Sequence, residues 1–308
     1  MQYIMGIDVG GTSVKIGQFD ASLELLHKWE IHTDKKNQGL DIVKDVISSI
    51  KKHVQLEDII GYGFGVPGPV KDGVVIECVN IGWPSEYHLA DICQTITGNK
   101  NIYVENDANV ATLGELSKGS AKNYHSAVML TLGTGIGGGI VIENQVVSGA
   151  NGASGEFGHI QIVREGGFSC NCGNTGCLET VASASGIRRL FHHYKLETKL
   201  KSHTTLKDPS AKSIMNMAKN GDELALYTID QVSAYLAYAS HIISLSVNPE
   251  VIIFGGGVSK AGEFLLDKIR TLFQNYPFKA TKNTKFLLAS LGNDAGMYGA
   301  AGLVMNHG

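Results

Sequence analysis

The sequence has little excess charge of either sign. Its 26 lysines and arginines against 29 aspartates and glutamates give a formal net charge of −3 over 308 residues. Nucleic acids and anionic membranes bind strongly basic surfaces, so the composition gives no electrostatic support for either partner. Charged residues make up 18% and hydrophobic residues 43% of the chain. These values are typical of globular proteins and exclude a disordered, collagen-like or coiled-coil chain.

Signals for export or membrane insertion are also missing. The first residues, MQYIMGIDVGG, contain no basic start followed by an apolar stretch and a small-residue cleavage site, so we expect no signal peptide. The uncharged runs at 123–142 and 231–249 are interrupted by glycines or by polar residues such as His241 and Asn248. Such runs do not suit a lipid-exposed helix. We therefore expect a cytoplasmic protein.

Cysteine is scarce and odd in number, with five residues, of which Cys170, Cys172 and Cys177 are clustered. Clustered cysteines in a chain without a signal peptide favour metal binding over disulfides. The C-x-C-x4-C spacing brings three thiolates to one point, and tetrahedral zinc needs a fourth ligand, for which His159 is the nearest candidate histidine. Four protein ligands leave no open position, so we expect a structural zinc rather than a catalytic one.

The length is about twice that of a usual domain and predicts two domains. Short β-branched runs alternate with amphipathic stretches, which indicates an α/β fold. We place the boundary in a polar stretch, giving domains 1–118 and 119–308, and expect a helix at about 294–306 that packs back onto the first domain. Strands are predicted at 3–10, 13–19, 25–33, 59–67, 101–106, 125–132, 138–147 and 251–254, and helices within 40–54, 106–119, 210–247 and 295–305.

Glycine is the residue in excess, with 38 of 308, about 12% against roughly 7% in average usage. Three glycine turns each follow a predicted strand, at 8–15, 133–139 and 255–259. Glycine lets backbone amides approach and point at phosphate oxygens. A tight hairpin is the alternative for any single turn, but three such turns in one chain favour phosphate binding.

The GTGIGG segment at 133–138 matches the G-x-G-x-x-G pattern of dinucleotide-binding proteins. That fingerprint requires a helix to begin at the turn, so that its N-terminus holds the pyrophosphate. The residues that follow, GIVIENQVV, predict a strand instead, which argues against a dinucleotide site. The sequence also contains no GxxxxGK[ST], so it has no P-loop.

Several acidic residues are candidates for chemistry. Asp8 directly precedes the first glycine turn, where a carboxylate beside a phosphate needs a cation such as Mg²⁺ between them; an ordinary turn aspartate is the alternative. Asn106 and Asp107 stand at a strand-to-helix junction, where helix capping and general-base catalysis are both open, and spacing does not choose between them. Glu156 and Glu179 flank the cysteine segment and either are solvated or hold sugar hydroxyls.

Seven segments in this order resemble the ROK family of bacterial sugar kinases, and its glucokinases most closely. The resemblance runs from about residue 4 to residue 302, and its most specific part is the cysteine segment with the upstream GEFGHI. The segments are GIDVGGTSVKIG, GVPGPV, ENDANVATLGE, TLGTGIGGGIV, GEFGHI, CNCGNTGCLET and IIFGGGVS.

The resemblance implies an α/β protein of two domains with the ribonuclease H-like, actin-type ATPase fold, with central mixed sheets and an interdomain cleft for ATP and a hexose. It implies transfer of the γ-phosphoryl group of ATP to the 6-hydroxyl of a hexose, glucose above all. Other hexoses, such as N-acetylmannosamine, mannose or fructose, remain alternatives. Mg²⁺ with the nucleotide, structural Zn²⁺ and a homodimer are implied as well.

The family's motifs also imply roles for individual positions. Asp107 becomes the base that takes the proton from the 6-hydroxyl. The implied sugar-binding residues are Asn106, Asp107, Glu156, His159 and Glu179, with Gly68 and Asn80 from the first domain. The implied nucleotide- and Mg²⁺-binding residues are Asp8, Gly10, Gly11, Thr12, Lys15, Gly133, Thr134, Gly135, Gly137, Gly138, Gly255, Gly256 and Gly257. The implied zinc ligands are His159, Cys170, Cys172 and Cys177, with the second ring nitrogen of His159 turned toward the sugar.

Two functions without turnover are alternatives. The ROK family includes sugar-responsive repressors with an N-terminal DNA-binding segment of several dozen residues, and the position of Asp8 leaves no room for one in this sequence. A sugar sensor without kinase activity is the other alternative. The intact ENDAN segment and both phosphate turns argue against it.

Overall fold

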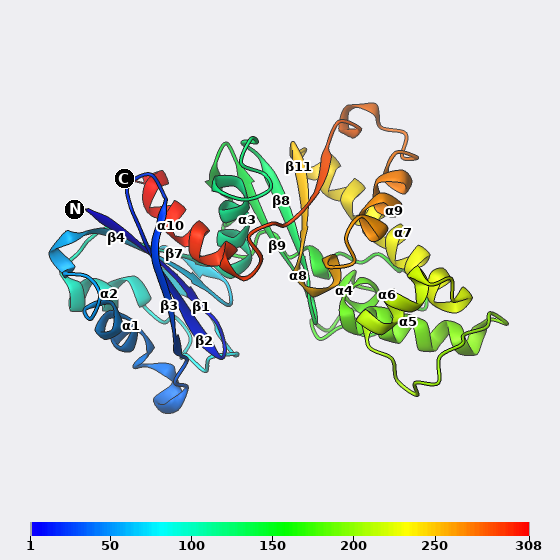
Figure 1. Ribbon diagram of the computed structural model, residues 1–308, viewed down its shortest axis with the longest axis horizontal. Helices are drawn as coiled ribbons and strands as arrows, with labels where there is room; N and C mark the ends of the chain where they lie inside the picture. The colour runs from blue at the N-terminus through cyan, green and yellow to red at the C-terminus, as the bar shows by residue number, and fades with distance from the viewer. Residues whose placement is uncertain (1, 308) are drawn as a thin grey trace. The chain divides into compact units, whose positions relative to one another are not determined.

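The computed structural model in Figure 1 describes residues 2–307, which divide into two compact units. The first unit comprises the residues up to Ala127, Gly139–Gly155 and the residues from Ser290. The second comprises Val128–Gly138 and Glu156–Ala289. The chain therefore leaves the first unit after Ala127, later than the predicted boundary at 118/119, and returns to it twice.

The first sheet is mixed, as predicted, and has the strand order β3-β2-β1-β4-β7. Strands β1, β2 and β3 form an antiparallel meander, and β4 and β7 are added in parallel to β1. The carboxyl ends of β1, β4 and β7 consequently meet at one edge. The bounds are β1 (Tyr3–Val9), β2 (Ser13–Phe19), β3 (Leu25–His32), β4 (Ile59–Val66) and β7 (Ile102–Asn106), close to the predicted ranges.

Helices cover both faces of this sheet. Because successive side chains of a strand point to opposite faces, Met5 and Ile7 of β1 pack with α1 (Ile42–Ile50) and α2 (Leu89–Thr97). Ile4 faces the other way, against α10 (Ala295–His307). Figure 1 shows α10, in red, beside the blue strand β1, so the two ends of the chain lie together in this unit. Helix α3 (Asp107–Ser117) and the short strands β5 (Val70–Lys71) and β6 (Val74–Val75) complete it.

Part of the glycine excess serves this packing. A Cβ on Gly6 would lie 2.2 Å from the carbonyl oxygen of Met297, and one on Gly63 would lie 1.7 Å from that of Ala300. A Cβ on Gly299 would lie 1.6 Å from the carbonyl oxygen of Val110. These contacts leave no space for a side chain, so α10 approaches the sheet and α3 through glycine. The three glycine turns therefore do not account for the whole excess.

The second sheet has the order β10-β9-β8-β11-β12. Strands β11 and β12 run parallel and β9 and β10 antiparallel, so this sheet is mixed as well. The strand that follows the second glycine turn is present, which confirms that no helix begins there. The bounds are β8 (Ala127–Leu132), β9 (Ile136–Ile142), β10 (Gln145–Val146), β11 (Val251–Gly255) and β12 (Lys285–Leu288).

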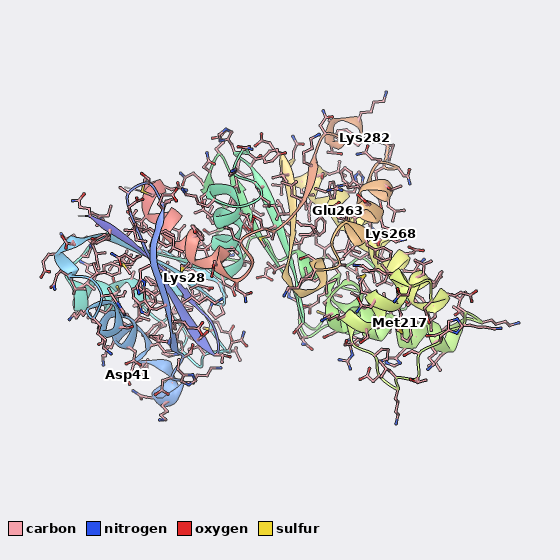
Figure 2. All side chains as sticks on the ribbon, in the orientation of Figure 1. Lys28, Asp41, Met217, Glu263, Lys268 and Lys282 are labelled. Carbon is pink, nitrogen blue, oxygen red and sulfur yellow. The ribbon has the colours of Figure 1, made fainter. Side chains whose placement is uncertain are left out.

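The second unit is mainly helical outside its strands. The predicted helical region 210–247 consists of α6 (Ala211–Lys219) and α7 (Glu223–Ser246). Figure 2 labels Lys268, whose Nζ lies 2.6 Å from Oδ1 of Asp230 and links α9 (Glu263–Phe273) to α7. The remaining helices are α4 (Glu179–Ala182), α5 (Ala184–Glu197) and α8 (Gly256–Ser259). Within residues 2–307, every helix is too short or too polar to cross a bilayer.

Candidate functional site

A cavity of about 360 Å³ lies at the carboxyl edge of the first sheet. Asp8 at the end of β1 and Asp107 at the start of α3 both line it. Crevices for ligands form at this edge of open α/β sheets because connecting loops diverge there. The lining residues are Asp8, Val9, Gly10, Gly11, Thr12, Lys35, Pro67, Asn80 and Asp107.

Asn106 and Asp107 differ in what they contact at the junction between β7 and α3. Asn106 is the N-cap, since its side chain accepts hydrogen bonds from the backbone amides of Ala108 and Asn109 at 2.9 and 3.3 Å. Its Nδ2 donates to the carbonyl oxygen of Gly68 at 3.0 Å. Asp107 is the first helical residue and lines the cavity, with one oxygen accepting from the amide of Ala108. The helix dipole favours a negative charge at this position.

A buried network under this junction fixes the backbone ahead of Asp107. Oε1 of Glu105 accepts from the amide of Asn106 at 2.7 Å and from Nδ2 of Asn109 at 3.0 Å, and its Oε2 accepts from Ser148. Oδ1 of Asn109 accepts from the amide of Ile140 at 3.2 Å. Glu105 and Asn109 are buried. Neither residue was predicted to have a role, because burial of a polar side chain leaves no signal in one sequence.

Asp8 is partly buried next to the first glycine turn. Burial raises the pKa of its carboxyl, and the charge of Lys15 opposes that rise. Nζ of Lys15 lies 3.8 Å from Oδ2 of Asp8 and donates to the carbonyl oxygen of Asn293 at 2.8 Å. The amide of Gly10 donates to the carbonyl oxygen of Ser13 at 3.0 Å, so it closes the turn. Lys15 does not line the cavity, whereas Gly11 and Thr12 do.

The cavity contains three residues that were not predicted as site residues, Val9, Pro67 and Lys35. Val9 is the last residue of β1. Pro67 follows β4, and Lys35 follows β3 at the edge of the sheet. Lys35 stands in the polar segment HTDKKNQG (32–39), which contains no recognisable motif, so the pattern offered no reason to select it. Gly68, which was predicted to bind sugar, does not line the cavity. Its carbonyl oxygen accepts the hydrogen bond from Nδ2 of Asn106.

The second and third glycine turns contribute to a different cavity, of about 720 Å³, within the second unit. Gly133 and Thr134 line it beside Gly257, and the amide of Ala184 at the start of α5 donates to the carbonyl oxygen of Gly133 at 2.8 Å. The walls combine apolar side chains with cationic ones. The apolar residues include Leu132, Met215, Val258 and Ala261, and the cationic ones are Arg188, Lys212, Lys219 and Lys260.

The other glycines of these two turns that were predicted to contact nucleotide do not line this cavity. A Cβ on Gly256 would lie 2.6 Å from the carbonyl oxygen of Leu132, and its φ of 83° suits glycine. Gly255 packs against Met129, and Gly137 and Gly138 lie inside β9. A Cβ on Gly135 would lie 2.7 Å from Oε2 of Glu179.

The predicted zinc ligands come together in the second unit. One donor atom each from His159, Cys170, Cys172 and Cys177 lies within 4.8 Å of all the others. Nδ1 of His159 is 3.5 Å from Sγ of Cys170, and the Sγ atoms of Cys172 and Cys177 are 3.7 Å apart. Zn–S bonds of about 2.3 Å at tetrahedral angles require sulfur atoms about 3.8 Å apart. The donor set and its spacing therefore fit zinc.

Two glutamates adjoin this cluster. His159 ends the short helix η3 (Phe157–His159), and its Nε2 lies 3.8 Å from Oε2 of Glu156. Its other ring nitrogen faces the thiols, so the imidazole is shared between the cluster and Glu156. Oε1 of Glu179 accepts from Sγ of Cys170 at 3.2 Å. Glu156 and Glu179 thus both contact residues of the predicted zinc cluster.

The family of the chain follows from a comparison with protein-family models, in which the model described as the ROK family matches residues 4–307. The chain belongs to the ROK family. It is 39% identical to a glucokinase from Halalkalibacterium halodurans over 98% of this chain and 95% of that protein.

Solved ROK structures resemble it over nearly their whole length. A ROK hexokinase from Thermus thermophilus has a TM-score of 0.83 and 28% identity, covering 98% of this chain and 97% of the other. A ROK family glucokinase from Streptomyces griseus, solved in complex with glucose and AMPPNP, has a TM-score of 0.74 and 30% identity, covering 98% of both chains. The predicted resemblance and the actin-like ATPase fold of this ROK protein are confirmed.

Proposed function

We propose that this ROK protein is an ATP-dependent hexokinase that transfers the γ-phosphoryl group to the 6-hydroxyl of glucose, with Asp107 as general base. One observation carries the proposal: Asp107 lines the same cavity as Asp8 and the Gly10–Thr12 turn. An acidic side chain for the sugar and a turn suited to phosphate thus meet within one unit. The glucokinase relative and the structure with glucose and AMPPNP support this choice of substrates.

Asp107 would act on the attacking hydroxyl. Its carboxylate accepts the proton of the 6-hydroxyl as that oxygen bonds to phosphorus, and the bond from phosphorus to the bridging oxygen of ADP breaks. Phosphoryl transfer asks a protein mainly to align the two substrates and to neutralise charge. Asn106 and Glu105 hold the backbone from which Asp107 projects.

Asp8 would meet the nucleotide as its Mg²⁺ complex. Its carboxylate lies beside a phosphate turn, where it would repel the phosphates unless a cation stands between them. Its place in the cavity and its distance of 3.8 Å from Lys15 fit a carboxylate that receives such a cation. Lys15 would compensate its charge when the nucleotide is absent.

The nucleoside would occupy the larger cavity of the second unit. Its volume of about 720 Å³ lies within the usual range for sites of small ligands. Apolar side chains such as Met215 and Val258 suit a base, and the four cationic residues suit phosphate oxygens. Gly133, Thr134 and Gly257 would be the contacts from the two glycine turns.

Glu156, His159 and Glu179 would hold the ring hydroxyls of the sugar. Carboxylates accept charge-assisted hydrogen bonds from hydroxyl groups. His159 and Cys170, Cys172 and Cys177 would hold zinc, which, when bound, would be structural because all four positions are taken by protein groups. That metal would fix the ring of His159 and the loop that precedes Glu179.

A direct assay tests the proposed function. The purified protein is incubated with Mg·ATP and each of glucose, mannose, fructose, N-acetylglucosamine and N-acetylmannosamine, and ADP and the sugar phosphate are both quantified. We expect glucose 6-phosphate to form with the highest kcat/KM of the panel. A higher kcat/KM for another hexose would replace glucose as the proposed substrate. Absence of sugar phosphate with every sugar would refute the proposed kinase activity.

Two further predictions accompany this proposal, one from the missing export signals and one from the resemblance. We propose that the protein acts in the cytoplasm and as a homodimer. Light scattering of the purified protein tests the second: a mass near twice 32.9 kDa is expected, and a mass of 32.9 kDa at micromolar concentration would refute it.

A further inference from the structure

Lys35 lies in a segment that is fixed to the first glycine turn. The backbone amide of Thr33 donates to the carbonyl oxygen of Thr12 at 3.0 Å, and its hydroxyl donates to that of Gly10 at 2.7 Å. Thr33 is buried. The start of the segment therefore keeps its place against the turn.

The other end of the segment is also held. Nε1 of Trp83, which is buried, donates to the carbonyl oxygen of Gly39 at 2.9 Å. The ring of Trp83 stacks on that of Tyr87 with centroids 4.7 Å apart. Between the two anchors, Asn37 and Gln38 have φ of 49° and 56° and turn the chain back. Lys35 thus projects from a short segment anchored at both ends.

The ammonium group of Lys35 reaches the turn. A Cβ built on Gly11 would lie 3.5 Å from its Nζ. The cavity that it lines also receives the carboxylates of Asp8 and Asp107. Among the residues that line this cavity, Lys35 alone is cationic, since Lys15 is directed to Asn293.

Lys35 and Asp107 also affect one common group, the thiol of Cys78. Burial raises the pKa of the Cys78 thiol; the charge of Asp107 raises it further and that of Lys35 lowers it. Both charges therefore act on one buried thiol.

These contacts matter because the cavity contains two carboxylates and, besides the Mg²⁺ proposed at Asp8, Lys35 would be a further positive charge for a phosphoryl group. Asp8 and Asp107 are both acidic, and a phosphoryl group in transfer carries negative charge on its three equatorial oxygens. A cation fixed near that group stabilises the transition state more than the free substrates.

We propose that Lys35 is a further catalytic residue, whose ammonium group contacts the phosphoryl group as it passes to the sugar. The inference rests on the proposed function. As the 6-hydroxyl oxygen bonds to phosphorus, its proton goes to Asp107 and the electron pair of the breaking bond goes to ADP. Lys35 neutralises the equatorial oxygens and exchanges no proton. The sugar phosphate formed should remain in contact with Lys35 until it leaves.

The test compares Lys35→Met and Lys35→Arg with the matched control Lys36→Met, whose side chain is exposed and does not line the cavity. We expect kcat of Lys35→Met to fall about 100-fold with the KM for sugar little changed. Lys35→Arg should recover part of the loss, and Lys36→Met should match the wild type. Since Lys35 is exposed, all three variants should keep the wild-type Tm.

Calorimetry supplies a readout that turnover does not. Lys35→Met should weaken the binding of glucose 6-phosphate by about tenfold, the loss of one charge-assisted contact, and leave glucose binding unchanged. A kcat within twofold of the wild type, or equal losses for glucose and glucose 6-phosphate, would overturn the role of Lys35. If the wild-type protein forms no sugar phosphate, the proposed function is refuted. The role of Lys35 is tested separately by binding: unchanged affinity of Lys35→Met for glucose 6-phosphate would refute it.

Discussion

The carboxylate of Glu115 accepts a hydrogen bond from the backbone amide of Ser290 at 2.8 Å. This bond joins the end of α3 to the point where the chain re-enters the first unit. The same carboxylate accepts from the amide of Leu291 at 2.8 Å and from the amide and hydroxyl of Ser120 at 2.8 and 3.1 Å. Glu115 is fully buried. One side chain therefore fixes two connecting segments.

Glu115→Gln should destabilise the protein strongly. The amide that replaces one oxygen faces N–H and O–H donors and leaves some of them unsatisfied. Hydrogen bonds to a charged group contribute about 1.5–3 kcal/mol each, so we expect a loss of at least about 1.5 kcal/mol in the free energy of unfolding, measured with urea. The control is Glu24→Gln, because Glu24 is an exposed partner of Lys118 and should contribute less than about 1 kcal/mol. Equal losses of stability in the two variants would refute the role of Glu115 in fixing the two segments.

Asp8→Asn should stabilise the protein without substrates and inactivate it. Burial raises the pKa of Asp8, so the folded protein binds this proton more tightly than the unfolded chain. The contribution of Asp8 to stability is then present below its unfolded pKa and is lost as the pH rises through its folded pKa. Removing the charge should raise Tm at pH 7 by a few degrees, since about 1 kcal/mol shifts Tm by about 2–4 °C. The gain in Tm should vanish at pH 3, where Asp8 is protonated in the wild type. A lower Tm of Asp8→Asn at pH 7 would show that the charge of Asp8 does not destabilise the fold.

Tyr62→Phe should also be stabilising. The hydroxyl of Tyr62, in the core of the first unit, is buried and has no hydrogen-bond partner among residues 2–307. Burying an unsatisfied hydroxyl costs about 1–3 kcal/mol, so the phenylalanine variant should be more stable by about 1 kcal/mol in urea unfolding. Tyr87→Phe is the control, because that hydroxyl donates to the carbonyl oxygen of Leu40 at 3.5 Å and its loss should bring no gain. A destabilised Tyr62→Phe would show that the hydroxyl is satisfied.

Cys177→Ser should remove the metal. Cys177 is buried in the cluster with its Sγ 3.7 Å from that of Cys172, and serine oxygen is a poor substitute for thiolate. Metal analysis should find one zinc per wild-type chain and well under half that in the variant, with a raised KM for sugar. Cys93→Ser, which changes a buried cysteine outside the cluster, should keep its zinc. Wild-type protein without zinc would refute the assignment.

The sequence predicted local structure better than it predicted which glycines line a cavity. The strand ranges, the cap at Asn106 and the gathering of His159 with the cysteines depend on short patterns, which one sequence displays. Gly255 and Gly256 follow the same pattern as Gly257, but they pack against Met129 and Leu132 instead of lining the cavity.

Long-range packing explains the features that were missed. Lys35 reaches Gly11 only because Thr33 and Trp83 hold its segment, and Glu105 acquires a role through Asn109 and Ser148. The limits of the units depend in the same way on where β9 and α10 pack, which the local pattern at 118/119 does not reveal.

In the proposed reaction, Asp107 removes the proton from the sugar hydroxyl. The most direct measurement is kcat of Asp107→Asn with glucose and Mg·ATP, together with its Kd for glucose. The exposed Asp45→Asn on α1 is the control and should keep wild-type turnover. Loss of a general base lowers the rate by about 10²–10⁴-fold, so we predict that fall in kcat with glucose affinity nearly unchanged. Wild-type turnover in Asp107→Asn would show that Asp107 is not the base.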